Sequence, residues 1–295
     1  MKGAKEVLPG FDSREAVVRG GRLCYYLAGE GTTVVLVHGL GGAASNWGEL
    51  APLLAKRARV LVPDMPGHGR SSPLPAMPNL AAPADRVALV AERERLGAAV
   101  VVGHSLGGLV ALRLALRHPG LVAGVVLAGS AGWSPSSRRA RQALLISAAL
   151  RPGRWVTPFR GLVAKSAFLR GVTLGWGVAD SDVLVPSAVE GFLAGPGLHT
   201  DTLSAARALV DDDVGVQLGS VRCPCLVLWG TEDSQTPIGD AFQYARRLRA
   251  PVRAIPGCGH LLIGERPAAC AHAIGEFLDR IGQLDELPLE PEALR

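Results

Sequence analysis

The residues best suited to chemistry form a short glycine-rich stretch in the first half of the 295-residue chain. Ser105 lies between Gly103 and Gly107 in a G-x-S-x-G pattern. The valines at 100–102 predict a buried strand before it, and the apolar spacing after it predicts a helix. A serine at such a sharp turn has strained backbone angles, and glycines on either side let the chain pass closely. The pattern therefore indicates a nucleophilic serine held above a helix N-terminus.

Three further motifs accompany this turn. Residues 38–42 read H-G-L-G-G after a predicted strand, residues 230–237 follow the spacing G-x-x-D-x-x-x-P, and His260 ends the sequence G-C-G-H. On these motifs, the chain from about residue 15 to about residue 280 resembles the α/β-hydrolase family, in its serine-nucleophile branch of esterases and lipases. The resemblance implies an α/β fold with a mostly parallel eight-stranded sheet, flanking helices and an inserted helical cap.

The same resemblance implies a catalytic triad. A serine hydroxyl needs a base, usually a histidine that a carboxylate orients, and in this family the order along the chain is serine, acid, histidine. Of the histidines after Ser105, only His260 follows a predicted strand, and flanking glycines would let its loop reach the strand ends. Asp233 falls on the aspartate of the G-x-x-D-x-x-x-P turn. We therefore expect Ser105 as nucleophile, His260 as general base and Asp233 as the orienting acid.

Acyl transfer also needs hydrogen-bond donors for the oxyanion of its tetrahedral intermediate. The resemblance assigns this role to the backbone N–H groups of Leu106 and Leu40, with Gly41 as the alternative to Leu40. We expect His38 and His68 to brace the adjoining loops. Candidates for the substrate pocket are Gly39, Gly41, His104, Trp47, Trp133 and Leu261.

Alternation of strands and helices predicts the rest of the sheet. We expect strands at 16–18, 23–27, 33–37, 60–62, 98–102, 121–128, 225–229 and 252–255, and a helix from about Ser45, as its cap, through Leu54. The alternation fails between Trp133 and about Leu209, where amphipathic pieces at 138–150, 158–169 and 187–193 predict a helical cap. The predicted domains are a core of residues 1–132 and 210–295 and a cap of residues 133–209.

Composition narrows the class of protein. The net charge is +5 with scattered arginines, no apolar run reaches the roughly 18–20 residues of a membrane span, and the N-terminus lacks a signal-peptide core. We expect a cytoplasmic protein without nucleic-acid or membrane partners, and we interpret the arginines at 138–141 as a solvated helix face. The five cysteines have neither metal nor disulfide spacing and are expected to be buried free thiols. No cofactor or metal is expected.

The nucleophile narrows the reaction class. Dehalogenases and epoxide hydrolases of this fold carry Asp where Ser105 stands, so we expect a carboxylesterase that forms an acyl-enzyme with a small apolar ester or lactone. A hydrolase of carbon–carbon bonds is the main alternative, although Leu261 and His104 replace the Trp and Asn usual in that branch. A perhydrolase, an acyltransferase and a triad-retaining small-molecule receptor are further alternatives.

Overall fold

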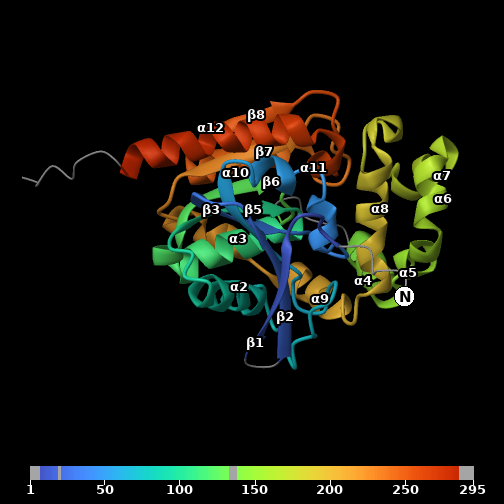
Figure 1. Cartoon of the computed structure of the whole chain (residues 1–295), viewed down its shortest axis with the longest axis horizontal. Helices are drawn as coiled ribbons and strands as arrows, with labels where there is room; N and C mark the ends of the chain where they lie inside the picture. The colour runs from blue at the N-terminus through green and yellow to red at the C-terminus, as the bar shows by residue number, and fades with distance from the viewer. Residues whose placement is uncertain (1–6, 19–20, 133–137, 286–295) are drawn as a thin grey trace, which may run out of the picture.

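The computed structural model describes residues 7–18, 21–132 and 138–285, and it contains an eight-stranded sheet (Figure 1). The strand order is β1-β2-β4-β3-β5-β6-β7-β8. β2 runs antiparallel to both of its neighbours, and all the other pairs are parallel. The strands are β1 (Asp12–Val18), β2 (Gly21–Ala28), β3 (Thr32–Val37), β4 (Ala58–Pro63), β5 (Ala99–His104), β6 (Val122–Ala128), β7 (Cys225–Gly230) and β8 (Val252–Ile255). The predicted mostly parallel sheet is confirmed.

Helices cover both faces of the sheet. Because side chains alternate along a strand, Val100 and Val102 of β5 pack toward α12, whereas Val101 packs toward α2 and α3. Figure 1 shows α12 on one side of the sheet and α2 and α3 on the other. These helices are α2 (Ala81–Arg93), α3 (Leu106–Arg117), α10 (Ile238–Leu248), α11 (Leu262–Glu265) and α12 (Pro267–Asp285).

Two local expectations were wrong. The segment after β3 forms a 3₁₀ turn, η1 (Ala44–Trp47), and then only the short helix α1 (Ala51–Leu54). The Ser45 hydroxyl does not cap a helix, because it donates to the Gly191 carbonyl oxygen at 2.7 Å. All five cysteines are free, but Cys223 is half-buried while the other four are buried.

A helical insertion separates β6 from β7 and lies at one side of the sheet in Figure 1. Its inner side chains, among them Val189 and Phe192, belong to the same buried cluster as the α12 face of the sheet. The piece predicted at 158–169 is broken at Ser166, whose extended backbone and hydroxyl cap the next helix at Leu169 N–H. Its helices are α4 (Arg138–Leu150), α5 (Gly153–Val156), α6 (Arg160–Lys165), α7 (Ala167–Leu174), α8 (Pro186–Ala194) and α9 (Leu203–Asp211).

The domain limits at residues 133 and 209 stay a prediction. Among the described residues, no helix is both long enough and apolar enough to cross a bilayer.

Candidate active site

Ser105 lies at the turn from β5 into α3 in a strained conformation. Its φ of 53° and ψ of −121° fall outside the helical and extended regions. A Cβ on Gly103 would lie 2.2 Å from the Gly107 carbonyl oxygen, and one on Gly107 would lie 2.1 Å from the Val37 carbonyl oxygen. Glycine is therefore required at both positions, which is the physical basis of the G-x-S-x-G pattern.

Asp233 and His260 form a buried pair at the ends of β7 and β8. His260 Nδ1 lies 2.8 Å from Asp233 Oδ2. The other carboxylate oxygen, Oδ1, accepts the N–H groups of Gln235 and Thr236, each at 2.8 Å, and the Thr236 hydroxyl donates to Oδ2 at 2.7 Å. Burial alone would raise the pKa of Asp233, but the hydrogen bonds from His260 and Thr236 outweigh it and lower the pKa. Asp233 is thus held as a carboxylate facing the imidazole.

His104 connects the serine turn with the histidine loop. Its Nε2–H donates to the carbonyl oxygen of His260 at 2.8 Å, and the two rings lie 5.0 Å apart. Burial, with the nearby His260, lowers the pKa of His104 to about 3, so this imidazole is neutral at ordinary pH. His104, which precedes Ser105, therefore holds the backbone of His260, which pairs with Asp233.

The loop after β3 lies against the serine turn. A Cβ on Gly39 would come within 3.0 Å of the Ser105 Cβ, so only a glycine fits comfortably at this close approach. Gly41, with φ of 69°, donates its N–H to His68 Nε2 at 3.1 Å. This bond engages the Gly41 N–H and ties the loop to His68.

Three neutral histidines hold this loop. His38 accepts the Met65 N–H, and the rings of His38, His68 and His199 follow one another at 5.2 and 5.1 Å. His199 comes from the insertion, accepts the Gly69 N–H at 3.0 Å and donates to the Gly41 carbonyl oxygen at 2.8 Å. His199 lies within the predicted cap of residues 133–209, but no local motif in the sequence marks this contact.

Asp64, at the end of β4, braces the neighbouring turn. Its carboxylate accepts the backbone N–H groups of Ala44 and Arg70 at 2.8 and 2.9 Å. Burial raises its pKa to about 6.

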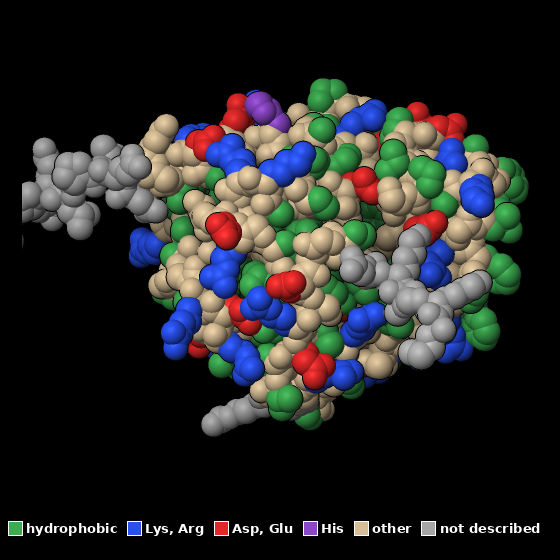
Figure 2. Space-filling view, in the orientation of Figure 1, with side chains coloured by type: hydrophobic (Ala, Val, Ile, Leu, Met, Phe, Trp, Pro, Cys, Tyr) green, Lys and Arg blue, Asp and Glu red, His purple; other side chains and the backbone are tan. Residues whose placement is uncertain are grey.

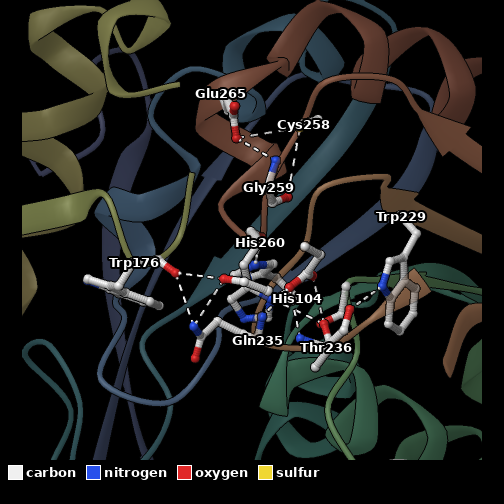
Figure 3. A network of polar contacts seen from close by, with 12 residues as sticks. His104, Trp176, Trp229, Gln235, Thr236, Cys258, Gly259, His260 and Glu265 are labelled. Atoms are coloured by element: carbon white, nitrogen blue, oxygen red, sulfur yellow. Dashed lines mark hydrogen bonds and ion pairs between the residues drawn. The ribbon is translucent and has the colours of Figure 1, made fainter. Parts of the chain in front are cut away.

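Glu265 was also missed by the sequence reasoning. This buried carboxylate accepts the Gly259 N–H at 2.8 Å on one oxygen and the N–H groups of Ala179 and Asp180 at 3.0 and 3.2 Å on the other. It therefore ties the loop that carries His260 to the insertion; Figure 3 shows its contact with Gly259. The only signal in the sequence is an acid five residues after His260, which by itself predicts nothing.

The segment that follows α7 contacts both loops of the buried pair. The Trp176 carbonyl oxygen accepts the Gln235 side-chain amide at 3.0 Å (Figure 3). The Gly177 carbonyl oxygen accepts the Leu261 N–H at 2.6 Å. Gln235 lies two residues after Asp233, and Leu261 lies next to His260. The insertion is thus hydrogen-bonded to the loops that position the acid and the histidine.

Comparison with known proteins identifies the family. The sequence profile described as "Alpha/beta hydrolase family" matches residues 34–273, which is most of the chain. The chain belongs to the alpha/beta hydrolase family. It is 30% identical over 276 residues to 2-hydroxymuconate semialdehyde hydrolase of Pseudomonas sp. strain CF600, covering 90% of this chain and 93% of that protein.

Other alpha/beta hydrolases are similar over nearly their whole length. Pimeloyl-[acyl-carrier protein] methyl ester esterase of Chromobacterium violaceum is 32% identical over 253 residues, covering 85% of this chain and 96% of the esterase. The structure of a thermophilic esterase from Thermogutta terrifontis superposes with a TM-score of 0.73 at 24% identity, over 92% of this chain and 99% of the esterase. The family and these relatives indicate that the chain is a hydrolase.

The remaining pocket candidates of this alpha/beta hydrolase lie in different surroundings. Trp47 is fully buried in the cluster between the α12 face and the insertion, and Leu261 belongs to the same cluster. Leu261 packs on Gly177, where a Cβ would lie 2.9 Å from the leucine Cγ. Trp133 lies outside the described residues. Within the described part of the chain, no three His, Cys, Asp or Glu side chains gather as metal ligands would.

Proposed function

We propose that this chain is a serine carboxylesterase that cleaves an ester or lactone of a small, largely apolar substrate. The observation that carries the proposal is the 2.8 Å contact between His260 Nδ1 and Asp233 Oδ2, together with the hydrogen bond from His104, the residue before Ser105, to the His260 carbonyl oxygen. A histidine oriented by a buried carboxylate is the arrangement that activates a serine hydroxyl. The insertion, rich in Leu, Val and Ala, supports an apolar substrate because it is proposed to cap the site.

In the proposed acylation step, Ser105 Oγ attacks the carbonyl carbon of the ester. His260 Nε2 accepts the hydroxyl proton and passes it to the leaving alcohol, while Asp233 stays ionised and keeps the proton on Nδ1. The N–H groups of Leu40 and Leu106 would stabilise the oxyanion. The Gly41 N–H donates to His68 Nε2, which supports this choice of Leu40, since an N–H already engaged in a hydrogen bond is a poor oxyanion donor.

In the proposed deacylation step, His260 takes a proton from water, which attacks the acyl group on Ser105. The tetrahedral intermediate collapses, releases the carboxylic acid and returns the proton to Ser105 Oγ. Neither step requires a metal ion or an organic cofactor, and water is the only second substrate.

The test is hydrolysis of p-nitrophenyl esters from acetate to laurate, with the Ser105→Ala variant alongside. We expect turnover that peaks at short or medium acyl chains and a loss of roughly 10⁴-fold in kcat for the variant. Mass spectrometry of the protein after rapid quenching should show an acyl adduct on Ser105. Equal inactivity of both proteins toward every ester would contradict the esterase proposal.

A carbon–carbon bond hydrolase is the second candidate. The observation that favours it is the 30% identity to a protein named 2-hydroxymuconate semialdehyde hydrolase. His104 and Leu261 differ from the residues usual in that branch, which keeps this candidate second. Incubation with 2-hydroxymuconate semialdehyde separates the two, because a carbon–carbon hydrolase would consume it faster than any ester of the series.

A further inference from the structure

The insertion carries a group of large apolar side chains that face solvent. Six of them lie within residues 153–176 and are 54–76% exposed. We call these residues the outer ridge: Trp155, Phe159, Leu162, Phe168, Val172 and Trp176. Figure 2 shows hydrophobic side chains at the right-hand edge of the molecule, where Figure 1 places α6 and α7. Isolated exposed apolar residues are ordinary, but a cluster on adjoining helices marks an interaction surface.

The outer ridge follows helical periodicity. Trp155, Phe159 and Leu162 are spaced i, i+4, i+7 along the nearly continuous helical run from α5 through α6. Phe168 and Val172 are spaced i, i+4 along α7. The same helices bury a different set of side chains, Val163, Ala164 and Leu174, against the core. These helices are therefore apolar on two sides, and core packing explains only one of them.

The charge of this segment has a single sign. Residues 133–179 contain eight arginines and lysines and no Asp or Glu, although the whole chain carries a net charge of only +5. Within the ridge, Arg154 and Lys165 are exposed, and the Arg154 guanidinium lies 4.5 Å from the centre of the Trp155 ring. Arg170 is engaged within the insertion, where it pairs with Asp182. The exposed cations beside the apolar side chains are thus Arg154 and Lys165, and the first acidic residues along the chain, Asp180 and Asp182, follow directly after the segment.

We propose that the outer ridge binds the surface of an anionic lipid bilayer. Aromatic and aliphatic side chains would enter the boundary between headgroups and acyl chains, while Arg154 and Lys165 contact anionic headgroups. A second copy of this chain fits less well, because the same basic face would oppose itself across a two-fold axis.

The outer ridge adjoins the candidate active site. Its last residue, Trp176, accepts the Gln235 amide through its carbonyl oxygen, and the next residue, Gly177, accepts the Leu261 N–H. A bilayer bound at the ridge would therefore lie beside the loops that carry Asp233 and His260. The binding itself depends on the ridge alone and does not rest on the proposed esterase activity.

The test is flotation of the full chain with vesicles of phosphatidylcholine alone or of phosphatidylcholine with phosphatidylglycerol. We expect binding to the anionic vesicles that weakens as salt is added. The Trp155→Ser/Phe168→Ser variant should lose at least tenfold in binding, since two large apolar groups no longer enter the bilayer. In the Arg154→Gln/Lys165→Gln variant, the affinity for anionic vesicles should fall roughly fivefold for each charge removed.

Matched controls lie elsewhere on the surface. Phe242→Ser removes an aromatic side chain of similar exposure on α10, and Arg93→Gln/Arg280→Gln removes two exposed charges outside the insertion. Both controls should bind vesicles as the parent chain does. Thermal melting checks that each variant is folded, and the charge variant keeps the test decisive if the apolar variant fails to fold.

Two outcomes would overturn the proposal. The first is that the parent chain binds neither vesicle, or binds both equally. The second is that, without lipid, the parent chain sediments as a dimer that Trp155→Ser/Phe168→Ser converts to a monomer, which would make a second copy the occupant of the ridge.

Discussion

The Nε2–H of His199 donates to the carbonyl oxygen of Gly41 at 2.8 Å, so a residue of the insertion holds the loop that follows β3. On its other side, Gly41 donates its N–H to His68. The peptide units around Gly41 are therefore fixed by two neutral imidazoles, one from the sheet domain and one from the insertion. Since Leu40 is the adjoining residue, the orientation of its proposed oxyanion donor depends on the docking of the insertion.

Replacing His199 should reduce catalysis through this loop. We expect His199→Leu to lower kcat by roughly 10- to 100-fold with a smaller change in KM, because a displaced donor weakens transition-state stabilisation more than substrate binding. His199→Gln should recover part of kcat, since its amide offers one acceptor and one donor. Steady-state kinetics on the best p-nitrophenyl ester checks this. Equal losses in both variants would show that hydrogen bonding by His199 is not what matters.

Replacing Glu265 should disturb the histidine loop. The amide nitrogen of Glu265→Gln cannot accept a hydrogen bond. Either the Gly259 N–H or the N–H groups of Ala179 and Asp180 therefore lose their acceptor. We expect unfolding to require about 1–3 kcal/mol less and kcat to fall by roughly tenfold or more. Urea unfolding and kinetics on the folded protein measure the two effects separately.

The control for Glu265 is Glu276→Gln, which removes a partly exposed carboxylate of α12 that pairs with Arg253 of β8. Exposed ion pairs contribute roughly 0–1 kcal/mol, so this variant should change little. If Glu265→Gln lowered stability but left kcat of the folded protein intact, Glu265 would be a structural residue and not a positioning one.

Asp233→Asn should nearly abolish turnover while leaving the fold intact. The amide that replaces the carboxylate favours the wrong tautomer of His260, so Nε2 can no longer accept the Ser105 proton; we expect a loss of about 10⁴-fold in kcat. Glu232→Gln, at the neighbouring exposed position, is the matched control and should retain activity. A loss below about tenfold for Asp233→Asn would assign the orienting role to another acid.

The protein should be unstable in acid. Burial lowers the pKa of His38 well below its usual value, that of His68 to about 4, and those of His104 and His199 to about 3. Below about pH 6.5 the unfolded chain takes up protons at these four positions and the folded chain does not, so the free energy of unfolding falls as pH falls. Asp64 acts in the opposite direction, because its raised pKa of about 6 lets the folded state bind one proton first.

Urea unfolding at about pH 7.5 and about pH 5 measures this dependence, with an expected loss of about 1 kcal/mol per pH unit for each of these histidines. In His199→Gln, the free energy of unfolding should fall less steeply with falling pH, because the unfolded chain takes up one proton fewer. An unchanged slope in His199→Gln would mean that His199 does not stay neutral in the folded state.

Much of this molecule could be predicted from local sequence because the responsible interactions are themselves local. Buried parallel strands select β-branched runs such as 100–102, and the turn at Ser105 admits only glycine at Gly103 and Gly107 because carbonyl oxygens lie where a Cβ would stand. The G-x-x-D-x-x-x-P motif likewise led to Asp233, whose partners Gln235 and Thr236 lie within three residues.

Only the tertiary structure shows which residues join the insertion to the loops of the candidate site. His199 and Gly41 are separated by 158 positions in the chain, and Glu265 joins segments that no short motif connects. The apolar spacing of Phe168 and Val172 is the pattern of a buried helix face, yet both side chains face solvent. Hydrophobic periodicity specifies that a face is apolar, but only the packing of the neighbouring helices decides which apolar face is covered.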